Sequence, residues 1–224
     1  MKTLIAVPCM DQVPAPFCGS LAKLKKVGDC VLSMQMGSLI YTSRNALATQ
    51  AIQIDADYVL WLDSDMVFEP DLLERMAGVA TEKDLDILTG LYFRRVPPYT
   101  PVLFDTLEIR DDQTCMWTEF SEIPNTLFKV GGCGFGCVFM KTDAFYDVQS
   151  KFGNMFAPFG STGEDLAFCW RARQCGFDIW CDPSIICGHV GYTISDEKYY
   201  EAYKQKLINE QNTKLLSFGE GRNA

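Results

Sequence analysis

Residues 58–69, YVLWLDSDMVFE, limit the possible folds of this chain more than any other stretch. The apolar first half, Tyr58–Leu62, predicts a buried strand, and Asp63 and Asp65 follow directly. In α/β proteins, ligands bind at the edge of the sheet where the carboxyl ends of the strands meet. Carboxylate oxygens at that edge suit a hard divalent cation, Mg²⁺ or Mn²⁺, that carries a diphosphate. The alternative interpretation is an ordinary strand followed by a solvated acidic turn.

The composition excludes some classes of protein. Hydrophobic residues make up 48% and charged residues 22% of the 224 residues, which is typical of a globular chain with a substantial core. The net charge of −9 argues against nucleic acid as a general partner, because that function needs a basic surface. Nucleotide binding is still possible, since a metal ion can neutralise the phosphates.

Neither membrane insertion nor export is expected. No run approaches the roughly 18–20 apolar residues of a transmembrane segment. The start of the chain, MKTLIAVPCM, is too short for the core of a signal peptide, and we interpret it as the first strand. Ten cysteines in a chain without such a signal are expected to stay reduced, which predicts a cytoplasmic protein.

Apolar patterns and turn residues predict alternating strands and helices, without an internal repeat or a linker. Buried strands are expected at residues 3–7, 30–34, 56–62, 86–91, 177–181 and 184–187. Helices are expected at residues 21–26, 38–54, 71–80, from 142 onward, at 164–176 and at 195–218. Residues 8–20 read as a loop and residues 100–122 as a small β-rich insertion. This order predicts an α/β fold with a central, mostly parallel sheet flanked by helices.

The helix predicted at residues 38–54 brings a cation near the site. Thr42 or Ser43 can cap its start, so Arg44 and Asn45 would lie in its first turn at the site edge. A cation beside free backbone N–H groups suits a diphosphate or a base carbonyl. The alternative is a solvated arginine on the helix surface.

Later segments add further candidate groups. The stretch LFKVGGCGFGCVFM at residues 127–140 predicts bulged strands near the site, because its glycines let another chain segment or a ligand approach closely. Glu164 and Asp165 begin a predicted helix, where they either stabilise its dipole or face a ligand. His189 is the single histidine and lies in a Gly-His-Val-Gly segment. It is either structural or a further donor to a metal held by carboxylates.

The order of these motifs resembles that of the GT-A glycosyltransferases, especially the family 2-like enzymes of bacteria and phages. The resemblance covers most of residues 1–195 and is carried by Ser43-Arg44-Asn45, Asp63-Ser64-Asp65, Glu164-Asp165 and His189. It implies one GT-A domain over residues 1–224. Within that domain, about 1–99 would bind the nucleotide sugar, about 100–194 would form the acceptor side, and 195–224 would be a helical tail.

The resemblance also implies a reaction and a role for each residue. A sugar would move from a nucleotide-diphosphate donor, of the UDP or GDP type, to a hydroxyl of a saccharide or other acceptor. Asp63, Asp65 and His189 would hold Mn²⁺ or Mg²⁺, while Asp165 would be the catalytic base with Glu164 assisting it. The donor would contact Pro8, Cys9, Met10, Gln35, Arg44, Asn45, Asp63 and Ser64. The acceptor would contact Gly132, Gly134 and Phe135.

Two segments depart from the family pattern. The region VLSMQMGS lacks the acidic residue that many family 2 members carry after the second strand, and Gln35 is the candidate replacement. The first strand ends in Pro-Cys-Met-Asp, which is uncommon in the family. The nucleotide therefore stays open.

Two alternative functions and one further partner are kept. A nucleotidyltransferase uses similar carboxylates, although residues 8–20 lack the Gly-rich basic loop that is usual in that class. A nucleotide-sugar-binding scaffold without activity is the second alternative. The C-terminal helix is expected to pack on the domain or to form a dimer.

Overall fold

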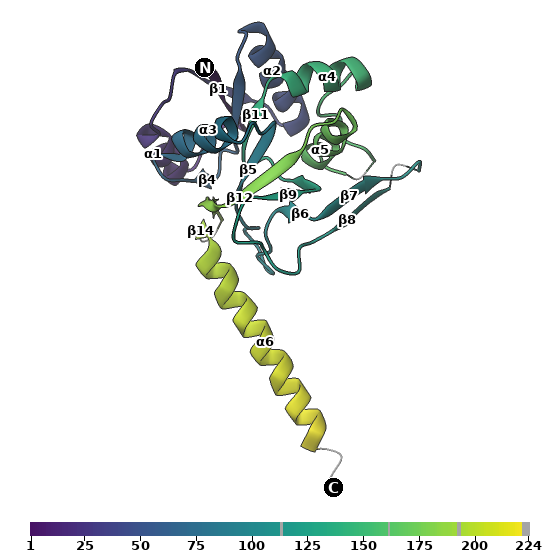
Figure 1. Cartoon of the computed structure of the whole chain (residues 1–224). Helices are drawn as coiled ribbons and strands as arrows, with labels where there is room; N and C mark the ends of the chain where they lie inside the picture. The colour runs from purple at the N-terminus through teal and green to yellow at the C-terminus, as the bar shows by residue number, and fades with distance from the viewer. Residues whose placement is uncertain (113, 161, 192–193, 221–224) are drawn as a thin grey trace.

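A computed structural model describes residues 1–112, 114–160, 162–191 and 194–220, with only the backbone described for residues 194–195 and 211–220. A seven-stranded sheet forms the centre of this part of the chain (Figure 1). Its order is β2 (Asp29–Met36), β1 (Lys2–Cys9), β3 (Tyr58–Leu62), β11 (Cys137–Lys141), β5 (Ile87–Leu91), β12 (Ile179–Ile186) and β9 (Phe128–Val130). Only β11 and β9 run antiparallel to their neighbours in this sheet. The predicted mostly parallel α/β sheet is confirmed.

Helices cover both faces of the sheet, because successive strand residues point to opposite sides. On β1, Leu4 and Ala6 face one core, and Ile5 and Val7 face the other. The first core is covered by α2 (Ile40–Gln53), α4 (Asp143–Phe152) and α5 (Glu164–Gln174). The second is covered by α1 (Ala15–Lys23) and α3 (Leu72–Glu82).

Short strands complete the carboxyl edge and the predicted insertion. In the insertion, β7 (Thr106–Ile109) pairs with β8 (Cys115–Thr118), and β6 (Leu103–Phe104) pairs with β10 (Gly132–Cys133). At the edge, β13 (Gly188–Val190) pairs with both β4 (Met66–Val67) and β14 (Ile194–Ser195). The β-rich insertion at residues 100–122 is thus confirmed.

Several predicted boundaries are wrong, each for a local reason. The loop predicted at residues 8–20 contains the start of α1. A proline is tolerated in the first turn of this helix, because the N–H groups of that turn have no hydrogen-bond partner within the helix. The two strands predicted at 177–187 are one strand, β12, with an irregularity between Asp182 and Ile186. Helix α2 has Leu39 at its N-cap and no side-chain cap, so Arg44 lies beyond its first turn.

Helix α6 (Glu197–Glu220) begins against the domain and then extends away from it (Figure 1). Tyr200 stacks on Phe93 with ring centroids 5.1 Å apart, and Tyr199 and Tyr203 contact the ring of Tyr99. The predicted packing of this helix is confirmed for its first two turns. Dimerisation through α6 stays a prediction.

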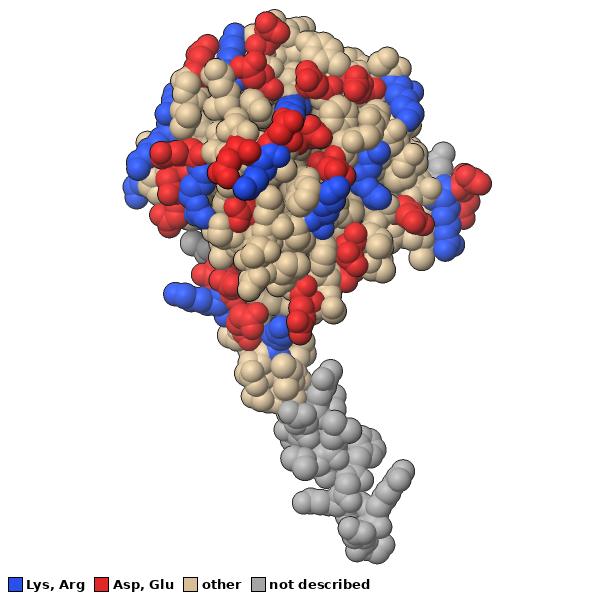
Figure 2. Space-filling model, in the orientation of Figure 1, with Lys and Arg blue, Asp and Glu red and all other residues tan. Residues whose placement is uncertain are grey.

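Acidic and basic side chains alternate on the face drawn in Figure 2, without a continuous basic patch there. This distribution agrees with the net charge of −9. Among the described residues, no helix has both the length and the apolar character needed to cross a bilayer.

The glycines at 131–136 make room for the chain itself. Tyr92 lies against Gly134 and Gly136, and the Gly136 N–H donates a hydrogen bond of 3.2 Å to the Tyr92 hydroxyl. A Cβ at Gly134 would overlap that hydroxyl, and a Cβ at Gly136 would lie 2.8 Å from Cζ of the same ring. Gly132, Gly134 and Phe135 are all buried in the core, and their predicted contact with an acceptor stays a prediction.

Gly134→Ala is expected to lower the free energy of unfolding by about 1–3 kcal/mol, because the added methyl overpacks the ring of Tyr92. Gly78→Ala is the matched control: this glycine lies on the exposed side of α3, and its Cβ would meet nothing within 4 Å. The control should gain about 0.5–1 kcal/mol from better helix propensity. Urea unfolding measures both, and equal effects would contradict the packing described for Tyr92.

Candidate functional site

The turn after β3 is held by backbone hydrogen bonds from two distant segments. The Asp63 N–H donates to the Gly136 carbonyl at 3.1 Å, which ties the turn to the strand segment before β11. The Val190 N–H donates to the Asp65 carbonyl at 2.8 Å, and β13 pairs with β4 next to it. Through this pairing, His189 reaches Asp65 although 124 residues separate them.

Arg44 joins the turn to the start of α5. Its Nη2 lies 2.8 Å from Asp63 Oδ1, and its Nε lies 3.1 Å from Glu164 Oε1. The side chain is 2% exposed, and its guanidinium packs against the rings of Trp61 and Phe135. Arg44 therefore lies beneath the site rather than at its surface. In this conformation the carboxylates of Asp63 and Glu164 hold two of its nitrogens, and the expected contact of Arg44 with a diphosphate stays a prediction.

Three carboxylates keep this buried arginine charged. Burial by itself favours the neutral form, but the charges of Asp63, Glu164 and Asp165 outweigh it and raise the pKa of Arg44. The Nη1 atom is also buried and has no hydrogen-bond partner among the described side chains and backbone. A buried guanidinium that bridges two acidic side chains fixes where both of them lie.

Asp65 and His189 form a pair that suits a divalent cation. His189 Nε2 lies 3.3 Å from Asp65 Oδ2, and Nδ1 lies 2.9 Å from the Phe93 carbonyl. A carbonyl can only accept, so Nδ1–H donates to it. Nε2 then donates to Asp65 when the ring is protonated and offers its lone pair to a metal ion when the ring is neutral. Metal-ligating histidines typically donate their other N–H to a carbonyl or carboxylate in this way.

The geometry divides the three predicted metal ligands, Asp63, Asp65 and His189, into two groups. Among the described residues, no three His, Cys, Asp or Glu side chains are grouped as a metal site. Asp63 Oδ1 is held by Arg44, whereas Asp65 and His189 stand together. Mg²⁺ and similar ions are commonly held by one or two protein groups together with substrate phosphates, so this pair fits such an ion. Asp63 then orients the turn, and its role as a direct ligand stays a prediction.

Asp165 has the environment of a base that works near neutral pH. Burial is the main cause that raises its pKa to about 6, and the negative charge of Glu164 adds to it. Its Oδ1 accepts a hydrogen bond of 2.7 Å from the Leu166 N–H at the start of α5. Asp165 therefore changes its ionisation in the range where a catalytic base is effective.

The residues predicted to bind the donor divide into two groups. Pro8 and Cys9 are buried in β1, and Asn45 uses both ends of its amide on the Tyr41 carbonyl and the Phe156 N–H. Met10 is 63% exposed and lines a cavity of about 330 Å³ beyond the carboxyl ends of β1 and β2. This cavity is also lined by Asp11, Met36, Gly37 and Ser38.

Gln35 and Ser64 are less constrained by the fold. Gln35 directs its amide to the Met36 carbonyl at 3.2 Å, and Ser64 is partly exposed between the two aspartates. Their predicted donor contacts stay predictions. The predicted donor contacts of Pro8, Cys9 and Asn45 also stay predictions, although the fold buries the first two and uses the amide of the third.

Arg95 is a site residue that the sequence reasoning missed as a donor-side group. Its Nη1 lies 2.6 Å from Asp65 Oδ2, and its side chain is 54% exposed. The sequence carries a signal, an arginine pair in an aromatic and proline-rich loop after a buried strand, but the pattern alone does not place that loop at Asp65.

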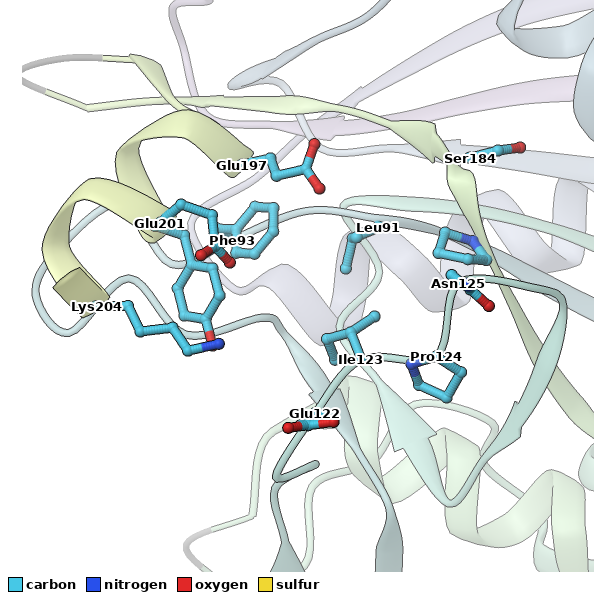
Figure 3. A pocket seen from close by; sticks show the side chains of 12 residues that line it. Leu91, Phe93, Glu122, Ile123, Pro124, Asn125, Ser184, Glu197, Glu201 and Lys204 are labelled. Carbon is cyan, nitrogen blue, oxygen red and sulfur yellow. The ribbon is translucent and has the colours of Figure 1, made fainter. Parts of the chain in front are cut away.

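A second cavity, of about 390 Å³, lies between α6 and the ends of β5 and β12. Figure 3 shows Glu197, Glu201 and Lys204 of α6 on one side of it, with Asn125 and Ser184 opposite. Phe93 lines this cavity, and its carbonyl contacts His189, so the cavity adjoins the site through one residue.

Residues 41–149 match the family model described as glycosyl transferase family 2. No curated protein sequence matches the chain. The solved structure titled A197 from STIV is similar over 85% of this chain and 86% of its own, with 20% identity and a TM-score of 0.62. A structure of GalNAc-T7 with UDP, GalNAc and Mn²⁺ is similar over 85% of this chain and 44% of its own, with 8% identity and a TM-score of 0.59. These likenesses show the GT-A type fold and confirm the predicted fold class.

Arg44→Met is expected to lower the free energy of unfolding by about 3–5 kcal/mol, because it leaves the Asp63 and Glu164 carboxylates without their buried partner. Arg94→Met is the control, since Arg94 is exposed and lies 3.4 Å from an exposed Glu119; its cost should stay below about 1 kcal/mol. Urea unfolding of both variants tests this, and a stable Arg44→Met protein would contradict the bridging role.

Proposed function

We propose that this chain, whose residues 41–149 match the glycosyl transferase family 2 model and whose fold is of the GT-A type, moves a sugar from a nucleotide-diphosphate donor to an acceptor hydroxyl in a metal-dependent reaction. One observation carries the proposal. Arg44 links Asp63 to Glu164, so the acidic turn after β3 and the acidic start of α5 lie side by side. A metal-binding pair and a base with a raised pKa thus share one edge of the sheet.

Asp65 and His189 are the residues that would hold Mn²⁺ or Mg²⁺. When bound, such an ion supplies Lewis-acid stabilisation of the leaving diphosphate. Asp165 takes the proton from the acceptor hydroxyl as that oxygen bonds to the anomeric carbon and the bond from this carbon to the diphosphate oxygen breaks. This role of Asp165 applies if the configuration inverts. If it is retained, Asp165 positions the acceptor.

The two cavities support separate places for donor and acceptor. The cavity at Met10 and Ser38 lies beyond the carboxyl ends of β1 and β2, the edge at which α/β sheets bind ligands, and we assign the donor base to it. The cavity beside Phe93 is assigned to the acceptor (Figure 3). Glu122, Glu197 and Glu201 face it against a single Lys204, which disfavours an anionic acceptor.

The alternatives make different predictions from the same site. A nucleotidyltransferase would release diphosphate from a nucleoside triphosphate, and a scaffold would bind a nucleotide sugar without turnover.

All ten cysteines are unpaired, which supports a reducing compartment and hence the proposed cytoplasmic location.

Thermal-shift measurements with UDP-, GDP-, CMP- and dTDP-sugars, with and without Mn²⁺, test the proposed function. Native protein should be stabilised by one nucleotide class only when Mn²⁺ is present, since Asp65 and His189 would hold the ion that carries the diphosphate. Asp65→Ala should lose this shift. No metal-dependent shift with any of these compounds would refute the proposal, and an unchanged shift in Asp65→Ala would refute the assignment of the metal.

The pH dependence of transfer should follow Asp165. The base must be ionised, so kcat/KM should rise with pH through about 6 and level off above it, because the pKa of Asp165 is about 6. Asp165→Asn should keep donor binding and lose transfer. Lost donor binding in this variant would place Asp165 in the metal site instead.

Asp165→Asn should also make the fold more stable at pH 8. A carboxyl whose pKa is raised in the fold binds its proton more tightly there than in the unfolded chain, so stability falls as pH rises through about 6. The neutral amide avoids this loss. The gain in Tm at pH 8 should shrink toward pH 4, and a gain that does not change with pH would contradict the raised pKa.

A further inference from the structure

Arg95 forms an ion pair with the carboxylate oxygen of Asp65 that would bind a metal ion. Its Nη1 lies 2.6 Å from Asp65 Oδ2, and His189 Nε2 meets the same oxygen at 3.3 Å. Without a metal, Arg95 therefore supplies a guanidinium that pairs directly with Asp65.

The loop that carries Arg95 is fixed at both ends and free at its tip. The Val102 N–H donates to the Tyr92 carbonyl at 3.0 Å, and the Arg94 N–H donates to the Thr100 carbonyl at 2.9 Å. The Tyr99 ring lies 5.5 Å from that of Tyr199 and 5.4 Å from that of Tyr203, which attaches the loop to α6. Residues 95–98 are exposed, so the guanidinium of Arg95 can change partners without a change in the core.

The buried arginine cannot do this. Arg44 is 2% exposed and is held between two carboxylates, whereas Arg95 is 54% exposed and has one ion-pair partner, Asp65, among the described residues. A divalent cation between Asp65 Oδ2 and His189 Nε2 would repel a guanidinium at the same oxygen. The nearest new anions would be the phosphates that such an ion carries.

We propose that Arg95 exchanges partners during donor binding: it leaves Asp65 when the metal ion binds and then pairs with the donor diphosphate. This rests on the proposed function and gives the leaving group an exposed cation, whereas Arg44 is buried between two carboxylates. A guanidinium suits the role, since its planar N–H groups match two phosphate oxygens. The exchange predicts that Arg95 weakens metal binding on its own and strengthens nucleotide binding in the presence of metal.

The test is Arg95→Gln in the full chain, with two binding measurements. Titration with Mn²⁺ alone, followed by electron paramagnetic resonance, should show binding several-fold tighter than in native protein, because no guanidinium competes for Asp65. Calorimetry with UDP and with GDP at saturating Mn²⁺ should show nucleotide binding weaker by roughly 10-fold or more, as for the loss of a charge-assisted hydrogen bond. A residue with a merely structural role would not shift the two affinities in opposite directions.

Arg94→Gln is the matched control, because Arg94 adjoins Arg95 but pairs with Glu119. It should change neither affinity. Arg95→Lys should recover part of the nucleotide affinity, since it keeps the charge without the planar geometry. Shifts in the same direction, or no shift, in Arg95→Gln would refute the exchange. Native protein that binds neither Mn²⁺ nor nucleotide would refute the proposed function and the exchange with it.

Discussion

The guanidinium of Arg44, buried between Asp63 and Glu164, is the interaction on which the site depends. A charge in the core is costly unless it is paired, and here each partner begins a different part of the site. One partner opens the turn after β3, and the other opens α5. The bridge brings Asp165 beside that turn, where burial raises the pKa of its carboxyl and the charge of Glu164 adds to the rise, while Arg44 opposes it.

A second link, between β4 and β13, brings in the other half of the chemistry. Its backbone pairing puts His189 beside Asp65, and the Phe93 carbonyl sets the tautomer in which Nε2 faces the carboxylate. The two links differ in character. Arg44 is buried and permanent, whereas Arg95 contacts Asp65 from an exposed loop. We infer that Arg44 holds the site together and that the exposed contact between Arg95 and Asp65 changes when a ligand binds.

The sequence is sufficient to predict the central sheet and the order of the motifs along the chain. Apolar runs such as Tyr58–Leu62 and the helix start at Glu164 have local signals in the residue pattern. It does not show which groups are buried, because burial depends on contacts far apart in the chain. Arg44 looks like a surface cation on α2 until Trp61 and Phe135 pack on it. Likewise, the sequence pattern predicts a ligand contact at Gly134, whereas in the fold the side chain of Tyr92 fills that space. The role of Arg95 depends on a contact 30 residues away.

Diffraction data at the manganese absorption edge, from crystals of the native protein with Mn²⁺ and either UDP or GDP, test the central claim most directly. The anomalous peak should lie between Asp65 Oδ2 and His189 Nε2, with the nucleotide phosphates completing its coordination and Arg44 still between Asp63 and Glu164. A peak held by other protein groups, or a nucleotide bound away from the turn after β3, would contradict the account.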